Sequence, residues 1–347
     1  MKSSLPLIFF LALLDEAQSL RFLGRVNPST RELTWPGTGV SFTFTGTSAS
    51  IGLEAITGTN SVQLQTDNQT IVILDVNGTS ISTPAGLSSG THTVTLRKRS
   101  EALYGSIFLG NITTTGTFTA DSIPTRKIEV IGDSISVGYG LDGTYPCGNS
   151  AAVENNPKTY AALAADALGA DYSIVAWSGI GLTRNYASAT PDPSPIMPDR
   201  WTRYGAQDAK NSYTFPPDRV PDVVVISLGT NDFGYEAGIR DPLDPGVYGN
   251  ATVSFVKTIQ TRYPKAAFFL LTSPMLNDGW PSAADAQKTT QRLALERARD
   301  ALGGTKVEVV DMPDQGSVVG CDYHPNAETH RRDGAILEEA IRRIMGW

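Results

Sequence analysis

The stretch Lys127–Gly140, KIEVIGDSISVGYG, decides the fold of this chain. Its residues Ile128, Val130 and Ile131 have the apolar, β-branched character of a short buried strand, and the turn Gly132-Asp133-Ser134 follows directly. Open α/β sheets bind their ligands at the carboxyl ends of the strands. The serine of this turn is therefore a candidate nucleophile. It requires a base, a group that orients the base, and donors for an oxyanion.

Strands and helices alternate from Lys127 to the C-terminus. The run Asp222–Leu228, DVVVISL, is almost wholly apolar, which is typical of a central parallel strand. A helix is expected with Asn156 as its N-cap and Pro157 at its first position, and Gly169 ends it. The pattern predicts a three-layer α/β domain with a parallel sheet over residues 127–347. Further strands are expected at Tyr172–Ala176, Ala266–Thr272 and Val307–Val310, and further helices at Thr252–Tyr263, Ala283–Leu302 and Ala327–Met345.

Residues 20–119 show a different pattern, with a period of two. Val40, Phe42 and Phe44 alternate with serine and threonine, and glycine- and asparagine-rich turns separate several short runs of this kind. This predicts an antiparallel β-sandwich of the jelly-roll type, although the spacing does not distinguish a sandwich from a barrel. Residues 120–126 are expected to link the two domains. The expected strands are Ser61–Gln65, Thr70–Val76, Thr91–Arg97 and Ser106–Ile112.

Residues 1–19 have the features of a secretory signal peptide. Lys2 gives a positive start, Leu5–Leu14 is an apolar run of ten residues, and Ala17-Gln18-Ser19 offers a cleavage site with small residues. Ten residues are too few to span a bilayer, and no later segment is apolar enough to do so. We therefore expect a secreted, extracellular protein. Four glycosylation sequons, at Asn68, Asn77, Asn111 and Asn250, agree with secretion.

Charge and cysteine content limit the kinds of partner and the redox state that we expect for this protein. The 347 residues carry a net charge of −7 and contain no basic cluster, which argues against a nucleic-acid partner. We expect a monomer without a membrane partner. The two cysteines, Cys147 and Cys321, are most simply a disulfide in an oxidising compartment, the alternative being two unrelated thiols.

Polar turns follow the first three predicted strands of the α/β domain. They are Gly132-Asp133-Ser134, Trp177–Gly181 (WSGIG) and Gly229–Asp232 (GTND). The carboxyl ends of parallel strands lie at one edge of a sheet, so these turns can converge. A fourth block, Asp322–Pro325 (DYHP), precedes the last predicted helix and contains a histidine.

These four blocks resemble the SGNH hydrolase superfamily over residues 127–347. The matching residues are Ser134, Gly179, Asn231 and His324. The preceding sandwich and the segment Gly320–Asn326 are similar to carbohydrate esterase family two, whose members remove acetyl groups from plant cell-wall polysaccharides. The resemblance implies a serine esterase that acts on acetylated polysaccharide or oligosaccharide, of the xylan or glucomannan type, with no cofactor.

The chemistry gives each matching residue a role. A serine hydroxyl needs a base, and an imidazole titrates near neutral pH, so His324 is the natural base for Ser134. The resemblance assigns the oxyanion hole to the backbone N–H groups of Ser134 and Gly179 and to the side-chain amide of Asn231. The acid of a triad is less clearly marked. Cys321 occupies the usual position of the family aspartate, and Asp322 lies one residue later.

We favour Asp322 as the carboxylate that orients His324, with a Ser134–His324 dyad as the competing hypothesis. Some members of the carbohydrate esterase group have an aspartate at this place, and others use a dyad supported by a backbone carbonyl. Asp311 and Asp314 are more distant candidates. A Cys147–Cys321 bridge is predicted because it would join the loop after the nucleophile to the segment that carries the base.

Several other motifs receive a structural interpretation. His92 and His330 lie away from the polar turns, and the three histidines have no metal-ligand spacing. Gly138–Gly143 (GYGLDG) matches a dinucleotide fingerprint without the strand-to-helix context that such a site needs.

Candidate sugar-binding aromatic residues are Trp177, Tyr235, Trp280 and Tyr323, of which Trp280 is preferred and Trp177 is equally compatible with the core. Two alternative functions remain, an SGNH esterase or lipase for other acyl esters and a non-catalytic carbohydrate-binding protein.

Overall fold

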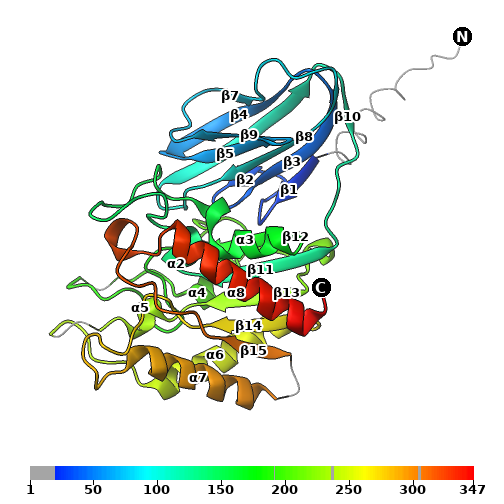
Figure 1. Cartoon of the computed structure of the whole chain (residues 1–347). Coiled ribbons are helices and arrows are strands. Elements are labelled where there is room, and N and C mark those ends of the chain that lie inside the picture. The colour runs from blue at the N-terminus through cyan, green and yellow to red at the C-terminus, as the bar shows by residue number, and fades with distance from the viewer. Residues whose placement is uncertain (1–19, 191, 236–237, 304–305) are drawn as a thin grey trace, which may run out of the picture.

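The structure, a computed structural model, describes residues 20–190, 192–235, 238–303 and 306–347. The predicted signal peptide, residues 1–19, lies outside the described residues. A β-sandwich formed by the first hundred described residues packs against one side of a larger α/β domain (Figure 1). The chain crosses once from one to the other, in the segment that joins β10 (Thr117–Thr119) to β11 (Arg126–Gly132).

The sandwich consists of two antiparallel sheets, as predicted. Alternating apolar side chains from both sheets meet in one core that includes Val40, Phe42, Phe44, Ile51 and Leu109. The first sheet has the order β1 (Leu20–Leu23), β3 (Gly39–Gly46), β8 (Gly90–Lys98), β5 (Val62–Thr66) and β6 (Gln69–Ile73), with β10 also paired to β3. The second sheet has the order β2 (Glu32–Leu33), β9 (Gly105–Thr114), β4 (Ala49–Gly58) and β7 (Ser80–Ser82).

The second domain has the predicted three layers. Its five strands are parallel and lie in the order β12 (Ala170–Ala176), β11, β13 (Val223–Ser227), β14 (Ala267–Leu271) and β15 (Val307–Val310). Helices α3 (Tyr160–Ala167) and α8 (Ala327–Met345) cover one face, and α6 (Pro245–Gln260) and α7 (Gln287–Leu302) cover the other (Figure 1). The chain changes direction across the sheet between β11 and β13. The carboxyl ends of these two strands therefore form a topological switch point, where open sheets bind ligands.

Three helix starts differ from the prediction, and one of them is that of α7, which begins at Gln287 and not at Ala283. Thr159, and not Asn156, caps α3, because its hydroxyl accepts a hydrogen bond from the backbone N–H of Ala162. Residues Asn156–Lys158 form a separate 3-10 turn, and the Asn156 side chain instead donates to the carbonyl of Ser136. Helix α6 begins earlier than expected, at Pro245, because the carboxylate of Asp244 caps it.

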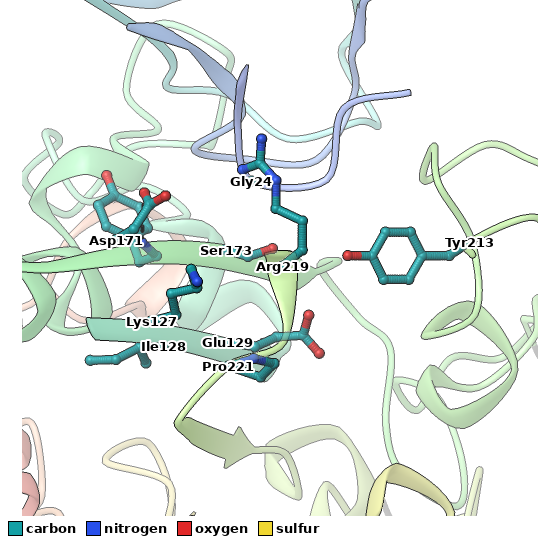
Figure 2. Close-up of a pocket in the computed structure, with 10 residues that line it drawn as sticks. Gly24, Lys127, Ile128, Glu129, Asp171, Ser173, Tyr213, Arg219 and Pro221 are labelled. Atoms are coloured by element: carbon teal, nitrogen blue, oxygen red, sulfur yellow. Dashed lines mark hydrogen bonds between the residues drawn. The ribbon is translucent and has the colours of Figure 1, made fainter. Parts of the chain in front are cut away.

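The two domains share a hydrophobic core. Trp35 and Ala102 come from the sandwich, yet both belong to the cluster that packs beneath α6 and α7. The guanidinium of Arg25 forms a buried ion pair with Glu129 on β11, with an N–O distance of 3.0 Å. A small cavity of about 30 Å³ lies at this junction. Figure 2 shows residues that line it, with Gly24 of the sandwich above the strands that carry Ser173 and Glu129. The sandwich is thus packed against the α/β domain through apolar and ionic contacts rather than tethered to it.

Candidate active site

The serine of the opening stretch lies at the start of a short helix. Strand β11 ends at Gly132, and α2 (Ser134–Val137) begins two residues later with Asp133 as its N-cap. The Asp133 carboxylate accepts a hydrogen bond from the backbone N–H of Ile135 at 3.0 Å, and burial raises the pKa of this carboxyl to about 7. A β-carbon at Gly132 would lie 2.0 Å from the Ser136 hydroxyl, so the turn requires a glycine there. This turn fixes the serine at the switch point.

The base and the nucleophile are 190 residues apart in the sequence and lie in contact in the structure. Nε2 of His324 lies 2.9 Å from Oγ of Ser134. The Tyr139 ring stacks on the imidazole with ring centroids 4.0 Å apart. Burial lowers the pKa of His324 to about 4, so the imidazole is neutral near pH 7 and is able to accept the serine proton.

The structure corrects the predicted triad. Nδ1 of His324 lies 3.1 Å from the backbone carbonyl of Asp322, whereas the Asp322 carboxylate accepts hydrogen bonds from the Tyr139 hydroxyl and the Asn149 backbone N–H, each at 2.9 Å. Asp322 and Tyr323 have positive φ angles of 50° and 62°, and this backbone conformation presents the carbonyl to the ring. The competing hypothesis, a Ser134–His324 dyad with a carbonyl acceptor, is the arrangement present. The two more distant candidates for the acid, Asp311 and Asp314, have other partners. The Asp311 carboxylate accepts a hydrogen bond from the Thr272 hydroxyl, and the backbone carbonyl of Asp314 accepts one from Arg332.

Two of the three predicted oxyanion donors, Ser134 and Asn231, line the same pocket as His324, and Gly179 lies in the loop that the Asn231 side chain contacts. Within the described residues, the backbone N–H groups of Ser134 and Gly179 donate to no other group. Gly179 adopts a φ of 80°, which favours glycine. The Asn231 side chain is buried and donates to the Ile180 carbonyl at 3.1 Å, which leaves the second hydrogen of its NH₂ group for a ligand.

Asp232 supports this arrangement, a role that the sequence analysis missed. Its fully buried carboxylate accepts hydrogen bonds from the backbone N–H groups of Leu182, Thr183 and Arg184 and from the Thr183 hydroxyl. It therefore holds the loop that continues from Gly179. The position of Asp232 directly after Asn231 was the available signal, because both side chains come from one short helix and contact the same loop, at Ile180 and at Leu182–Arg184.

The dyad opens into a pocket of about 640 Å³. Two of the predicted aromatic residues, Tyr235 and Trp280, line it, and the Trp280 side chain is 66% exposed. Tyr186 also lines the pocket and was not predicted. The remaining wall consists of Ala187, Thr230, Gly234, Met275, Leu276, Pro281 and Gln287, together with Ser134, Asn231 and His324.

The other two aromatic candidates do not line the pocket. Trp177 is buried in the core and packs beneath the guanidinium of Arg200, 4.1 Å from the ring centroid. Its side chain lies on the inner side of the strand end, which the sequence pattern alone did not reveal. Tyr323 is exposed, but its ring packs on Tyr145, and the two hydroxyls are 2.6 Å apart. The prediction of direct substrate contact is corrected for the buried Trp177, and for the exposed Tyr323 it stays a prediction.

The predicted disulfide is present. Cys147 and Cys321 are bonded, and the bridge links segments 174 residues apart. Gly140 lies against the bridge with a φ of 61°, and a β-carbon there would lie 2.7 Å from the β-carbon of Cys321. The glycine motif Gly138–Gly143 therefore follows α2 as a loop that permits close approach of the segment carrying the base, rather than opening a helix after a strand.

The remaining histidines have structural surroundings. His92 bridges the Asp67 carboxylate and the Ser88 carbonyl in the sandwich. His330 is buried in α8, its Nδ1 accepts from the Tyr160 backbone N–H, and burial lowers its pKa to about 3. Among the described residues, no cluster of histidine, cysteine, aspartate or glutamate is arranged to hold a metal ion. No helix in the described ranges is long and apolar enough to cross a bilayer.

A serine–histidine dyad and oxyanion donors at the strand ends of a parallel sheet define a serine hydrolase of the SGNH type. Comparison with known proteins agrees. Residues 22–123 match the model of the carbohydrate esterase 2 N-terminal domain, and residues 130–332 match the GDSL-like lipase/acylhydrolase family. The chain belongs to carbohydrate esterase family 2.

Relatives extend over the whole described chain. A solved carbohydrate esterase family 2 enzyme with its carbohydrate binding domain, from Corynascus thermopiles (Myceliophthora fergusii), is 63% identical, and the match covers 95% of this chain and 100% of that one with a TM-score of 0.93. The cellulase/esterase CelE of Acetivibrio thermocellus is 33% identical over 92% of this chain, which spans only 38% of that relative. An acetylxylan esterase/glucomannan deacetylase of Cellvibrio japonicus is 28% identical over 90% of this chain and 84% of its own length.

Proposed function

We propose that this protein is a serine esterase that removes O-acetyl groups from carbohydrate, on polysaccharides of the xylan or glucomannan type. The observation that carries the proposal is the 2.9 Å contact between His324 Nε2 and Ser134 Oγ, at the floor of a pocket that also receives Asn231. A neutral imidazole, an adjacent hydroxyl and preorganised amide donors are the components that ester hydrolysis requires.

The geometry defines the order of steps. Nδ1–H of His324 donates to the Asp322 carbonyl, which leaves the Nε2 lone pair facing the serine hydroxyl. His324 takes the proton as Ser134 Oγ attacks the acetyl carbonyl. The developing oxyanion is stabilised by the Ser134 and Gly179 N–H groups and by Asn231, and one such donor is typically worth about 3 kcal/mol. The imidazolium then protonates the leaving sugar oxygen, which gives the alcohol and an acetyl-enzyme.

Water completes the reaction. His324 removes a proton from a water molecule as it attacks the acetyl-enzyme, and the second tetrahedral intermediate uses the same donors. Collapse of this intermediate releases acetate, and the proton returns from His324 to Ser134. No step requires a cofactor.

The carbohydrate part of the proposal has two supports. Relatives of this chain are named acetylxylan esterase/glucomannan deacetylase and carbohydrate esterase family 2 enzyme. In addition, the exposed Trp280 ring stands at the rim of the pocket, where it is able to pack on the C–H face of a sugar. The alternatives are hydrolysis of other acyl esters and carbohydrate binding without catalysis. The intact dyad argues against the second.

The cellular setting is also a proposal. We infer a secreted, extracellular glycoprotein from the signal-like residues 1–19 and the four sequons. The sequon asparagines Asn68, Asn77, Asn111 and Asn250 are all exposed, as glycosylation requires. Mass spectrometry of protein expressed in a secretory host would test this, because glycan on these asparagines and a mature N-terminus near Leu20 are the expected findings.

A substrate panel tests the activity. Acetylated xylan, acetylated glucomannan, p-nitrophenyl acetate and longer p-nitrophenyl esters should be compared, with Ser134→Ala as the control. We expect acetate release from the polysaccharides and loss of at least 1,000-fold in Ser134→Ala, as is typical when a nucleophile is removed. A preference for long acyl chains would support the lipase alternative. Undiminished activity of Ser134→Ala would overturn the proposal.

A further inference from the structure

A buried acidic side chain of the sandwich reaches the active site of the other domain. Glu101 lies in the connection between β8 and β9 and is fully buried. Its Oε2 accepts a hydrogen bond from the backbone N–H of Ser178 at 3.0 Å. Ser178 immediately precedes Gly179, whose backbone N–H is one of the proposed oxyanion donors. A side chain of the sandwich thus fixes the peptide next to an oxyanion donor.

The same residue is linked to the loop that carries the base. The backbone N–H of Glu101 donates to Glu154 at 2.6 Å, and the other Glu154 oxygen accepts from the Asn149 side chain at 2.7 Å. The Asn149 backbone N–H in turn donates to the Asp322 carboxylate at 2.9 Å. One continuous set of hydrogen bonds therefore runs from Ser178 through the sandwich to the residue that orients His324.

Glu101 lies among other buried titratable side chains. The Lys98 side chain donates to the Ser100 and Glu101 carbonyls, and burial lowers the pKa of this lysine to about 7. Burial raises the pKa of Glu101, and burial together with the charge of Glu101 raises that of Glu154 further. The contact that carries the argument is geometric, since Oε2 of Glu101 accepts from the backbone N–H of Ser178.

We propose that Glu101 is a positioning residue for the oxyanion hole, so that the sandwich domain supplies part of the catalytic geometry. The proposal rests on the esterase function proposed above. A misplacement of about 1 Å in a catalytic group can cost roughly 100-fold in rate. On the far side of Gly179 the loop is held by other contacts, since the Gly179 carbonyl accepts a hydrogen bond from the backbone N–H of Tyr186 at 2.7 Å. Glu101 supplies the constraint on the near side, at the backbone N–H of Ser178.

The test compares three substitutions at Glu101 with a matched glutamate. Glu101→Ala removes the acceptor, Glu101→Asp shortens it by one methylene, and Glu101→Gln keeps a carbonyl oxygen at the same reach. Glu32→Ala serves as the control, because Glu32 is a partly buried sandwich glutamate near Lys98 without a hydrogen bond to residues 177–181. Thermal unfolding of every variant is measured alongside its kinetics.

We expect Glu101→Ala and Glu101→Asp to lower kcat for p-nitrophenyl acetate by 10- to 100-fold with KM changed less than twofold. Glu101→Gln should retain at least one fifth of kcat, and Glu32→Ala should stay within twofold of the wild type. The affinity of phenylboronic acid, which forms a tetrahedral adduct with the serine, should fall in parallel with kcat. The rate of Ser134 labelling by a fluorophosphonate probe should fall by the same factor.

Some results would overturn the proposal. They are an unchanged kcat in folded Glu101→Ala or Glu101→Asp, an equal loss of kcat in Glu32→Ala, or a loss confined to KM. Failure of the esterase function has a different signature, because wild-type protein would then neither hydrolyse p-nitrophenyl acetate nor label at Ser134. If only the polysaccharides are inert, p-nitrophenyl acetate and the probe still test Glu101.

Discussion

Nδ1 of His324 lies 3.1 Å from the carbonyl oxygen of Asp322, and the carboxylate of the same residue faces Tyr139 and Asn149 instead. A carbonyl is a neutral acceptor. It fixes the tautomer and the orientation of the ring without adding a charge beside the imidazolium. This relationship decides what a substitution at position 322 does.

Asp322→Asn should therefore retain at least about a tenth of the wild-type activity. In a triad with a bonded carboxylate, the equivalent change lowers kcat about 10,000-fold, because it stabilises the wrong tautomer of the histidine. Here the backbone carbonyl persists in the variant, and we expect a loss of no more than about tenfold. The measurement is kcat for p-nitrophenyl acetate at pH 7, with His324→Ala as the reference for loss of the base. A loss near 10,000-fold would show that the Asp322 carboxylate takes part in the mechanism.

The pH profile should reflect the low pKa of His324. Burial lowers that pKa from its usual 6.5 to about 4, and the neutral form is the active one. Activity is therefore retained while the pH stays above about 4 and is lost as the pH falls through that value. The plot of kcat/KM against pH for p-nitrophenyl acetate should show its acidic limb near pH 4. A limb near pH 6.5 would contradict this, and recovery of activity at pH 7 controls for acid denaturation.

Trp280 should matter for polysaccharide and not for a small ester. Its exposed ring lines the rim of the pocket, so Trp280→Ala removes a surface for a sugar without touching the dyad. An aromatic contact of about 1 kcal/mol corresponds to a roughly fivefold change. We expect KM for acetylated xylan to rise by about that factor, with p-nitrophenyl acetate unaffected. Trp280→Phe should recover part of the loss, and equal effects on both substrates would argue against a sugar platform.

The Cys147–Cys321 bridge should contribute strongly to stability. It closes a loop of 174 residues, for which chain entropy predicts stabilisation of up to about 5 kcal/mol. Replacing both cysteines by serine should lower the free energy of unfolding by about 2–5 kcal/mol in urea titrations. Because Cys321 is three residues from the base, kcat should fall as well. An unchanged unfolding midpoint would show that other contacts hold the two bridged loops together. One such contact is the hydrogen bond from the backbone N–H of Cys321 to the Gly140 carbonyl.

The ion pair between the domains provides a further test. Arg25→Met leaves the Glu129 carboxylate buried without its partner, and breaking a buried pair in this way costs about 3–5 kcal/mol. Adding Glu129→Gln to Arg25→Met removes the stranded charge and should recover part of the stability. The free energy of unfolding of both variants, measured by urea denaturation, checks this. If the double variant is less stable than Arg25→Met, the charge is not the cause of the loss.

Much of the active site could be predicted because it is built from strand ends. Ser134, Gly179 and Asn231 follow three neighbouring parallel strands, and parallel strands place such turns at one edge. The parallel sheet and the last helix were predictable for another reason, because long apolar runs and strong periodicity in the sequence reflect burial. The short strands β2, β7 and β10 were not, because two or three residues carry too little pattern.

Other features depend on contacts that sequence distance conceals. The role of the Asp322 carboxylate was predicted wrongly because the positive φ angles of residues 322 and 323 turn it away from the ring. Glu101 is 77 residues from Ser178 and in another domain, so no local pattern connects them. Trp177 follows a strand like a loop residue, yet its ring turns inward. For Asp322 and Trp177 the direction of one side chain decided the outcome, and for Glu101 the packing of the two domains did.

The shared core of Trp35 and Ala102 has a consequence for protein engineering. Domains that are joined only by a linker can be exchanged between enzymes, because each domain has a hydrophobic core of its own. Here the sandwich contributes side chains to the interior of its neighbour, so a chimera would need matching partners for Trp35, Arg25 and Glu101 in the recipient. The pair should therefore be recombined as a single unit, with new modules fused outside both.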